Sequence, residues 1–405
     1  MPAGITTDKL LIFGAGLLRG LAAGAISVLA AVFLAKRGFP EGEIGIVLAS
    51  GMAGVLAGTI YGTFFAERVG RRRSLVLLAA LAALGGAAFA LVQTLWLAAL
   101  AAFFGMLNTQ GTDRGGAQAL ETAILPGIVA AGDRTRVFAW YNALQDAGGA
   151  LGALVAAMPE LLRDGLSLPE PLAYESTVIG YAAVLVIVAL LYSRLSSATE
   201  ATVHIQNVAP HDLPPSARRE VRNFSLLAAL DAFGGGFIGS ALIAYFLYAR
   251  FGVAEGALAL LFAIARVMTV LSHFVAAWLS TRIGLVNTMV FTHIPSSLLL
   301  LTLPIAPDFT VAATLFVLRE GLAEMDVPTR QSYLMAIVPP HERTWASGMS
   351  QLARAGGRMV APLFAGAAMQ TGALWIPLAA GASVKIAYDL LLWRAFRRLK
   401  PPEER

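Results

Sequence analysis

The sequence predicts an all-α polytopic membrane protein with twelve transmembrane helices, arranged as two pseudo-symmetric bundles of six. Three observations support this prediction. Hydrophobic residues make up 57% of the chain and charged residues only 14%, whereas a soluble domain carries about 25% charged residues. The apolar residues form long runs between short polar breaks, and two distant parts of the chain repeat each other.

Twelve apolar segments are long enough to cross a bilayer core of about 30 Å as helices. They lie near residues 10–35, 43–66, 74–93, 96–124, 136–160, 174–194, 224–248, 256–280, 285–305, 309–337, 343–370 and 374–394. The first is longer than the apolar part of a signal peptide, so we expect it to be a spanning helix.

A polar stretch rich in alanine, serine and proline separates the sixth segment from the seventh. This composition is typical of a linker. We therefore predict an amino-terminal bundle over 1–196, a cytoplasmic linker over 197–222 and a carboxyl-terminal bundle over 223–405.

The second half of the chain repeats the first at an offset of about 213 residues. Residues 113–144 align with 326–353, and Asp113 falls on Asp326. Each half contains an even number of segments, so the two copies have parallel topology. Two homologous halves in a membrane protein indicate a carrier with one site between them, exposed to each side in turn.

Arginine is concentrated in the polar breaks that follow the even-numbered segments and in the carboxyl-terminal tail. Basic residues favour the cytoplasmic side of a membrane. We therefore predict a multi-pass protein of the cytoplasmic membrane, with both termini and the linker facing the cytoplasm.

The segment 63–73, TFFAERVGRRR, resembles the signature loop between helices 2 and 3 of the major facilitator superfamily of secondary transporters, usually written G-x-L-a-D-R-x-G-R-R. The glutamate replaces the family's aspartate, and Thr63 replaces its leading glycine. A degenerate copy at 277–284 occupies the matching loop of the second half. The resemblance extends over the whole chain and implies that family's fold and secondary transport, but not a substrate.

The resemblance implies that this loop is a cytoplasmic latch that stabilises one state of two rocking bundles. Its acid can lie at the amino-terminal end of a neighbouring helix, and its arginines hold the loop at the interface. The predicted latch residues of the loop are Glu67, Arg68, Arg71 and Arg72. The alternative is that the arginines only fix the orientation in the membrane.

Ionisable residues within spanning helices cost roughly 2.5–3.5 kcal/mol each on insertion scales, so each needs a partner or a wet cavity. In the resembled family, helices 1, 4, 7 and 10 line the central cavity. On that mapping, the candidates for substrate or proton binding are Arg19, Asp113, Arg114, Asp231, Glu320 and Glu324. For any one of them, a structural ion pair is the alternative. Helix 12 carries two further charges, Lys385 and Asp389.

In the predicted helix over 309–337, the helical period separates the charges into two stripes. One stripe, expected to pair internally, holds Arg319, Asp326 and Arg330. The other, expected to present two unpaired acids, holds Glu320 and Glu324. Three residues nearer the cytoplasmic ends are predicted to form gate or structural salt bridges: Glu121, Asp326 and Arg330.

We therefore expect a secondary transporter that is driven by an ion gradient. The expected ion is the proton, because a buried carboxylate can exchange a proton on alternate sides. The mixed charges favour efflux of a small amphipathic or charged molecule. The expected partners are this substrate, protons and the lipid bilayer, and the expected state is a monomer. The chain has no cysteine and no recognisable nucleotide-binding or hydrolase motif, so we expect no enzyme, cofactor or metal site. The basic residues lie in the polar breaks, so the net charge of +5 does not predict a nucleic-acid partner.

Three alternatives remain open at this point. Organic-anion transport is favoured by arginines within the predicted spans: Arg19, Arg114, Arg266, Arg319, Arg354 and Arg358. A lipid flippase needs a cavity that opens sideways to lipid. A non-transporting sensor or assembly partner is a different class of protein, against which the latch and the buried acids argue.

Overall fold

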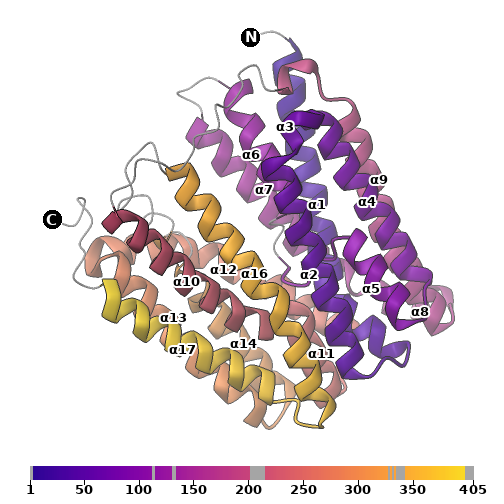
Figure 1. The fold of residues 1–405 in the computed structure, drawn as a ribbon. Helices are drawn as coiled ribbons and strands as arrows, with labels where there is room; N and C mark the ends of the chain where they lie inside the picture. Colours follow the sequence, from indigo (N-terminus) through magenta and orange to yellow (C-terminus); the bar gives the residue numbers. More distant parts are fainter. Residues whose placement is uncertain are drawn as a thin grey trace. The chain divides into compact units, whose positions relative to one another are not determined.

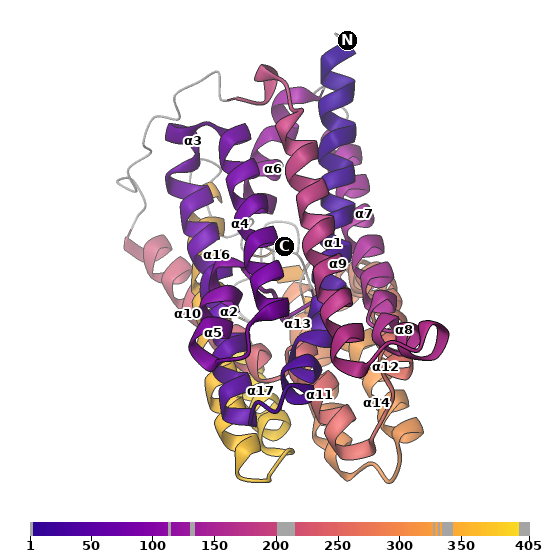
Figure 2. The ribbon, with the colours of Figure 1, turned by 90° about the vertical axis from the view of Figure 1, so that its right-hand side faces the viewer.

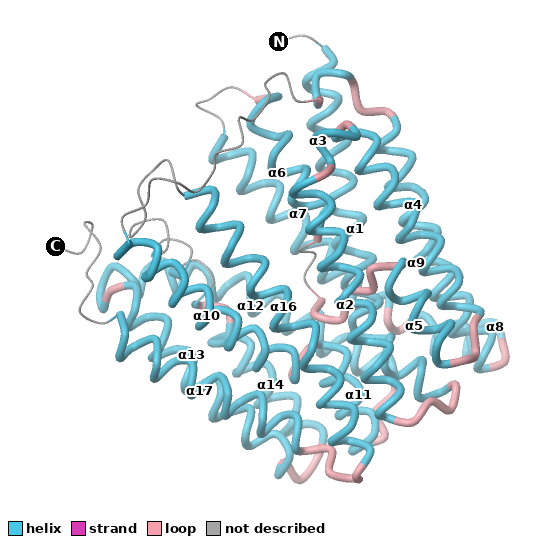
Figure 3. Tube along the Cα trace, in the orientation of Figure 1, coloured by secondary structure: helices cyan, strands magenta, loops and turns pink. Residues whose placement is uncertain are grey.

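A computed structural model describes residues 3–111, 115–129, 134–200, 215–326, 329–330, 333 and 343–396. All regular structure within these ranges is helical, and short loops connect the helices (Figure 3). Two predicted site residues, Asp113 and Arg114, lie outside the described residues.

The chain divides into two compact units. Unit 1 contains Met1–His204 and Gly239–Ala263, and unit 2 contains Ile205–Ile238 and Ile264–Arg405. The units follow the predicted halves except for residues 239–263, which pack with the first unit. The exact bundle boundaries therefore stay a prediction.

Unit 1 contains the helices α1 (Ala3–Lys36), α2 (Glu41–Phe64), α3 (Ala66–Val69), α4 (Arg71–Leu91), α5 (Leu95–Phe104), α6 (Gly116–Ile128), α7 (Arg134–Val155), α8 (Met158–Leu166), α9 (Glu170–Ser193), the 3-10 turn η2 (Ser197–Thr199), α11 (Ser240–Phe251) and the start of α12 (Glu255–Ile283). Helix α1 packs against α7 and α9, as Figure 1 and Figure 2 show.

Glycine allows the close approach of α1 and α7. A Cβ atom on Gly20 would lie 2.4 Å from the backbone oxygen of Gln145, and one on Gly24 would lie 2.2 Å from that of Gly149. Small residues at such contacts are the usual means by which membrane helices pack tightly. This packing fixes the depth of Arg19, one residue before Gly20.

Unit 2 contains α10 (Pro215–Phe237), the remainder of α12, α13 (Leu285–Thr302), the 3-10 turn η3 (Leu303–Ile305), α14 (Phe309–Ala323), α16 (Arg343–Gln370) and α17 (Ile376–Phe396). Helix α10 packs against α16 and α17, and α13 packs against α14 and α17. Aromatic rings at one end of this unit form a buried core around Phe224, Tyr333 and Phe396.

Each of the twelve predicted segments lies on one or two of these helices, and eight stretches among the described residues are long and apolar enough to cross a membrane. Several segments predicted as continuous are not. The fourth is interrupted between Phe104 and Gly116, and the seventh between Phe237 and Ser240. The fifth is interrupted between Val155 and Met158, and α14 ends at Ala323 within the tenth. The interruption of the fourth segment begins with the polar and glycine-containing stretch 105–111, and that of the seventh follows the glycine run 234–236. Both compositions weaken a helix.

Candidate functional site

The first buried ionic contact lies in unit 1. Arg19 on α1 donates from Nη2 to Oε2 of Glu121 on α6 at 2.7 Å, and both side chains are buried. Arg19 was predicted in a substrate cavity, with a structural ion pair as the alternative, and Glu121 in a gate or a structural salt bridge. The structure joins the two residues in one salt bridge, and their role in transport stays a prediction.

Two tyrosines complete this pair. The hydroxyl of Tyr192 donates to Oε1 of Glu121 at 2.7 Å, and that of Tyr141 donates to Oε2 at 2.5 Å. Gln145 donates in turn to the Tyr141 hydroxyl at 3.0 Å. Glu121 accepts at both oxygens and faces only donors in these contacts, which suits an ionised carboxylate. We call Arg19, Glu121, Tyr141 and Tyr192 the arginine–glutamate cluster.

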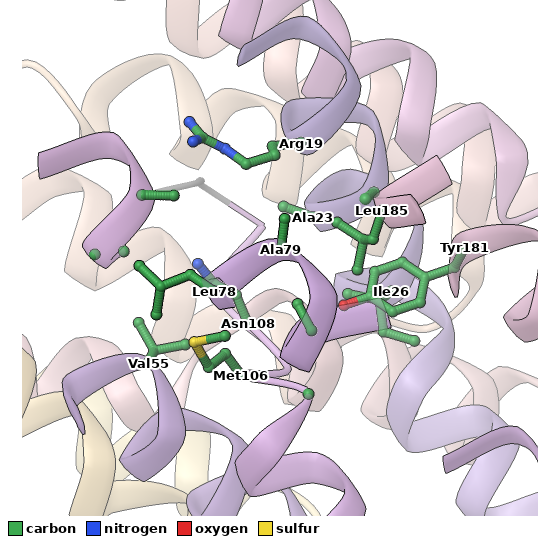
Figure 4. A pocket seen from close by; sticks show the side chains of 16 residues that line it. Arg19, Ala23, Ile26, Val55, Leu78, Ala79, Met106, Asn108, Tyr181 and Leu185 are labelled. Atoms are coloured by element: carbon green, nitrogen blue, oxygen red, sulfur yellow. The ribbon is translucent and has the colours of Figure 1, made fainter. Parts of the chain in front are cut away.

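A cavity of about 90 Å³ adjoins this cluster within unit 1 (Figure 4). Its wall is mostly apolar, formed by α1, α2, α4, α9 and residues 105–108 and 115–117. Three lining residues are polar: Arg19, Asn108 and Tyr181. In Figure 4, Arg19 lies at one edge, Tyr181 at another, and Val55 and Met106 lie below. Since one water needs roughly 10–15 Å³ of such space, the cavity has room for several waters or a short apolar group.

The interrupted fourth segment forms part of this cavity wall. Met106 has a φ of +47° and Gly111 one of +73°, so the backbone leaves the helix between α5 and α6. Asn108 turns its Oδ1 back to accept from the backbone N–H of Gln110 at 3.0 Å. Non-helical backbone at membrane depth is stable only where protein or a wet cavity surrounds it.

The start of α11 supplies donors to the same stretch. The backbone N–H of Ala241 donates to the carbonyl of Thr109 at 3.2 Å, and Oγ of Ser240 donates to that of Gln110 at 3.2 Å. Gly239 leaves room for this contact, because a Cβ there would lie 2.7 Å from Nε2 of Gln110. Interruptions in two separate segments therefore satisfy each other's backbone groups.

The second buried ionic contact is larger and centres on Asp231 of α10 in unit 2. Its Oδ2 accepts from Nη1 of Arg354 at 2.8 Å and lies 3.5 Å from Nη1 of Arg330. Its Oδ1 accepts from Nζ of Lys385 at 2.8 Å. The Asp231 carboxylate thus meets three cations, with the two arginines on one oxygen and the lysine on the other.

His293 of α13 extends these contacts. Its Nδ1 lies 2.9 and 3.1 Å from the two carboxylate oxygens of Asp389. Its Nε2 lies 3.1 Å from Nζ of Lys385 and 3.9 Å from Oδ1 of Asp231. All of these side chains are buried.

Asp326 closes the other end through an ion pair with Arg330, as predicted for these two residues. We call the connected group of seven ionisable side chains the aspartate–histidine network: Asp231, His293, Asp326, Arg330, Arg354, Lys385 and Asp389.

The prediction for the remaining charges of the tenth segment is wrong. Glu320 was expected to be unpaired and Arg319 to pair with Asp326, but Arg319 forms an ion pair with Glu320. Helix α14 ends at Ala323 and Glu324 follows as its carboxyl-terminal cap. The helical period therefore does not extend from 319 to 326.

The predicted latch loop has a different arrangement from the expected one. Glu67 pairs with Arg71 at 2.7 Å within the loop, and Arg68 and Arg72 are exposed. The acid at a helix amino terminus is Glu200, whose carboxylate accepts from the backbone N–H groups of Arg71 and Arg72 at 2.7 and 3.3 Å. Glu200 follows α9 and caps the start of α4. Whether the loop acts as a latch stays a prediction.

Sequence reasoning missed His293, Tyr192 and Glu200. His293 carries the same signal that selected Asp231, an ionisable residue inside an apolar run, and could have been found by it. Tyr192 and Glu200 offered no such signal, because a tyrosine at a helix end and an acid in a linker are ordinary.

Comparisons with known proteins agree with this architecture. A family model described as the Major Facilitator Superfamily matches residues 12–223. The chain is 25% identical to a protein of Saccharomyces cerevisiae described as an uncharacterized membrane protein, YJR124C, over 95% of this chain and 93% of the relative.

Solved structures give the same fold. The nucleoside transporter NupG is 14% identical with a TM-score of 0.72, over 98% of this chain and 99% of that one. A D-xylose–proton symporter is 17% identical with a TM-score of 0.69, over 99% of each chain. At such identities the likeness shows the fold alone, and it confirms the predicted fold class. With an all-helical fold, buried charges inside apolar helices and a family match over more than half its length, this multi-pass membrane chain belongs to the major facilitator superfamily and is a secondary transporter.

Proposed function

We propose that this transporter is proton-coupled and exports a small amphipathic molecule by alternating access. The observation that carries the proposal is the aspartate–histidine network, which buries seven ionisable groups inside the apolar helices of unit 2. Buried charges at membrane depth are costly and usually mark ion or substrate pathways. Histidine adds a group that can bind a proton at one ring nitrogen while the other keeps its hydrogen bond.

The substrate class follows from the cavity in unit 1. Its wall is apolar except for Arg19, Asn108 and Tyr181, which suits an amphipathic molecule with a short apolar part. Its volume of about 90 Å³ admits a small group. We propose that Asp113, Arg114 and Glu324 contribute to substrate or proton binding as well, from the fourth and tenth segments.

The ion pairs count against organic-anion transport. Arg19, Arg319 and Arg354 each contact a carboxylate: Glu121, Glu320 and Asp231, respectively. An arginine whose charge is already neutralised attracts a substrate anion less strongly. We therefore propose that Arg19 acts as a polar residue of the cavity wall, and Glu320 as a paired acid near the substrate path, and not as free charges.

The proposal includes the placement of the chain. The arginine-rich breaks support a cytoplasmic position for both termini and for the loop containing Glu67 and Arg71. We propose a monomer in the cytoplasmic membrane, with the loop contacts stabilising one state.

The test uses purified protein in lipid vesicles. A thermal-shift screen of metabolites and drugs first identifies a ligand, and exchange of labelled for unlabelled ligand then measures transport without any gradient. Uptake driven by an imposed proton gradient, with an internal pH dye, measures coupling. We expect both exchange and gradient-driven uptake. Exchange that is unaffected by the proton gradient, with no proton movement, would refute coupling while leaving transport intact.

A further inference from the structure

We infer that His293 is the proton-binding site of unit 2 and that a proton at its Nε2 exchanges the partner of Asp231, from Lys385 to His293. This inference rests on the proposed proton coupling, but its proton-binding group is an imidazole and not a carboxylate. The bound proton breaks the contact between Lys385 and Asp231 and forms one between His293 and Asp231.

The partners of His293 assign its resting tautomer. Nδ1 lies within hydrogen-bond distance of both oxygens of Asp389, and an ionised carboxylate only accepts, so Nδ1 carries the hydrogen. Nε2 then offers a lone pair, which accepts from the Lys385 ammonium at 3.1 Å. The observed contacts are therefore those of a neutral histidine.

A second proton on the ring is incompatible with one of these contacts. Once Nε2 carries a hydrogen, it and Nζ of Lys385 are both donors with positive charge, 3.1 Å apart. Two like charges at this distance repel, and neither can accept from the other. Lys385 and His293 must then separate.

The nearest new acceptor is already in place. Oδ1 of Asp231 lies 3.9 Å from Nε2, about 1 Å beyond hydrogen-bond length. Arg354 and Arg330 both contact Oδ2. Among the described contacts, Oδ1 accepts a hydrogen bond from Lys385 only. Protonated His293 can thus replace Lys385 on Oδ1 without disturbing the arginines.

The other ionisable groups near His293 already have partners. Three neighbours come from α17. Asp389 accepts from Nδ1, and Lys385 donates to Nε2. The Tyr388 ring is perpendicular to the imidazole, with 6.1 Å between the ring centroids. Helix α10 contributes Asp231. On the α14 side, Ser296 of α13 donates to the Arg319 carbonyl, and the Arg319 side chain pairs with Glu320.

Helix α13 is suited to a small movement at this point. Pro295 lies inside the helix, two residues after His293. Proline lacks the N–H that would bond the carbonyl four residues earlier and commonly kinks a helix. The exchange would loosen the link of α13 to Lys385 of α17 and strengthen its link to α10. The proton comes from a hydronium ion: one of its O–H bonds breaks, an N–H bond forms at Nε2, and a water molecule is left.

A direct test follows the ring nitrogens. The full chain, labelled with ¹⁵N-histidine in lipid nanodiscs, is titrated from about pH 8 to about pH 5 around the ordinary histidine range. The chain has five histidines, and the spectrum of His293→Gln assigns His293 by subtraction. His273→Gln is the matched control, a second histidine inside a spanning helix of unit 2, whose Nε2 has no hydrogen-bond partner among the described residues.

We expect His293 to show a hydrogen on Nδ1 alone at high pH and on both nitrogens at low pH. A His293 that stays neutral throughout, or that carries its hydrogen on Nε2 at high pH, overturns the inference. If His293→Gln does not fold, a chain with the other four histidines replaced by glutamine leaves His293 as the single labelled ring.

Transport separates this inference from the proposed function. In vesicles, His293→Gln should reduce proton-driven uptake relative to ligand exchange by about tenfold, within the range of coupling between linked sites, whereas His273→Gln should leave the ratio near that of the natural protein. A coupled natural protein whose ratio is unchanged by His293→Gln refutes the site alone. A natural protein without proton-driven uptake refutes the proposed function.

Discussion

The two units solve the same problem, charge inside apolar helices, in different ways. The arginine–glutamate cluster of unit 1 contains one cation, one anion and two tyrosine hydroxyls, with every contact between a donor and a fixed acceptor. The aspartate–histidine network of unit 2 joins seven ionisable groups and includes a histidine. The first arrangement holds its charges in place, and the second can change its charge.

The repeat sharpens this comparison. Asp231 lies 212 residues after Arg19 (231 − 19), within one residue of the offset of about 213 between the two halves. Equivalent helices thus carry a cation in unit 1, Arg19, and an anion in unit 2, Asp231. Arg19 pairs with a glutamate, whereas Asp231 pairs with two arginines and a lysine. The fold is repeated, whereas the polar chemistry built on it is not.

The largest expected effect comes from Asp231→Ala. The change leaves Arg354, Arg330 and Lys385 buried without their shared carboxylate, and breaking a buried pair costs about 3–5 kcal/mol. We expect a fall in the thermal unfolding temperature in detergent and loss of proton-driven uptake. Asp231→Ala combined with Lys385→Met should recover part of the stability. Full stability of the single variant would show that the network contributes little.

A smaller loss is expected from Glu121→Gln in unit 1. One cation, Arg19, loses its charged partner, while the glutamine can still accept from Tyr141 or Tyr192. We expect destabilisation of about 1.5–3 kcal/mol, the range for a hydrogen bond to a charged group.

The double variant Arg19→Met with Glu121→Met is the control for unit 1, since it removes both charges together and leaves neither buried alone. Tyr141 and Tyr192 lose their acceptor on Glu121, so we expect a loss of about 1–3 kcal/mol for each buried hydroxyl left without a partner. Arg19 lines the cavity, so ligand binding should weaken, whereas the number of protons moved per ligand should stay near that of the natural protein. A folded double variant that moves fewer protons per ligand would show that the cluster is not a fixed structural pair.

A third prediction compares the two acids near the loop. Glu200→Ala removes the carboxylate that caps the start of α4, for which about 0.5–2 kcal/mol is typical. Glu67→Ala removes only a partly exposed ion pair, for which about 0–1 kcal/mol is typical. Chemical denaturation should therefore rank Glu200→Ala as the more destabilising change. The reverse order would indicate that Glu67, and not Glu200, is the acid that stabilises this loop, as the sequence predicted.

The smallest effect on stability is expected from filling the cavity of unit 1 with Ala79→Leu. The cavity has about 90 Å³ of space, so the added methyl groups should change the free energy of unfolding by less than about 1 kcal/mol. Ligand exchange should nevertheless fall if the substrate enters this cavity. Leu84→Ala, at an exposed position on the same helix, is the control, and unchanged exchange in Ala79→Leu would exclude the cavity from the transport path.

Helix positions followed from the sequence with little error, because runs of apolar residues of bilayer length leave no other regular structure. The interruptions did not follow. Residues 105–111 contain polar residues and two glycines, which weaken a helix. The contact of Thr109 and Gln110 with the start of α11, by contrast, joins segments that are distant in the sequence.

The candidate sites were predicted as residues but not as pairs. Helical period places Arg319 and Asp326 on one face only if the helix continues, and α14 ends before Asp326. The pairing of Arg19 with Glu121, and of Asp231 with Lys385, joins residues more than 100 positions apart. Such pairings depend on which helices are neighbours, and a single sequence contains no direct record of that.

One measurement tests the comparison between the two units most directly: the number of protons moved per ligand in vesicles that contain each variant. We predict a ratio near that of the natural protein for the double variant Arg19→Met with Glu121→Met, and a ratio near zero for His293→Gln. A normal ratio in His293→Gln together with a lost ratio in the unit 1 variant would contradict this comparison, because the proton would then move through the arginine–glutamate cluster.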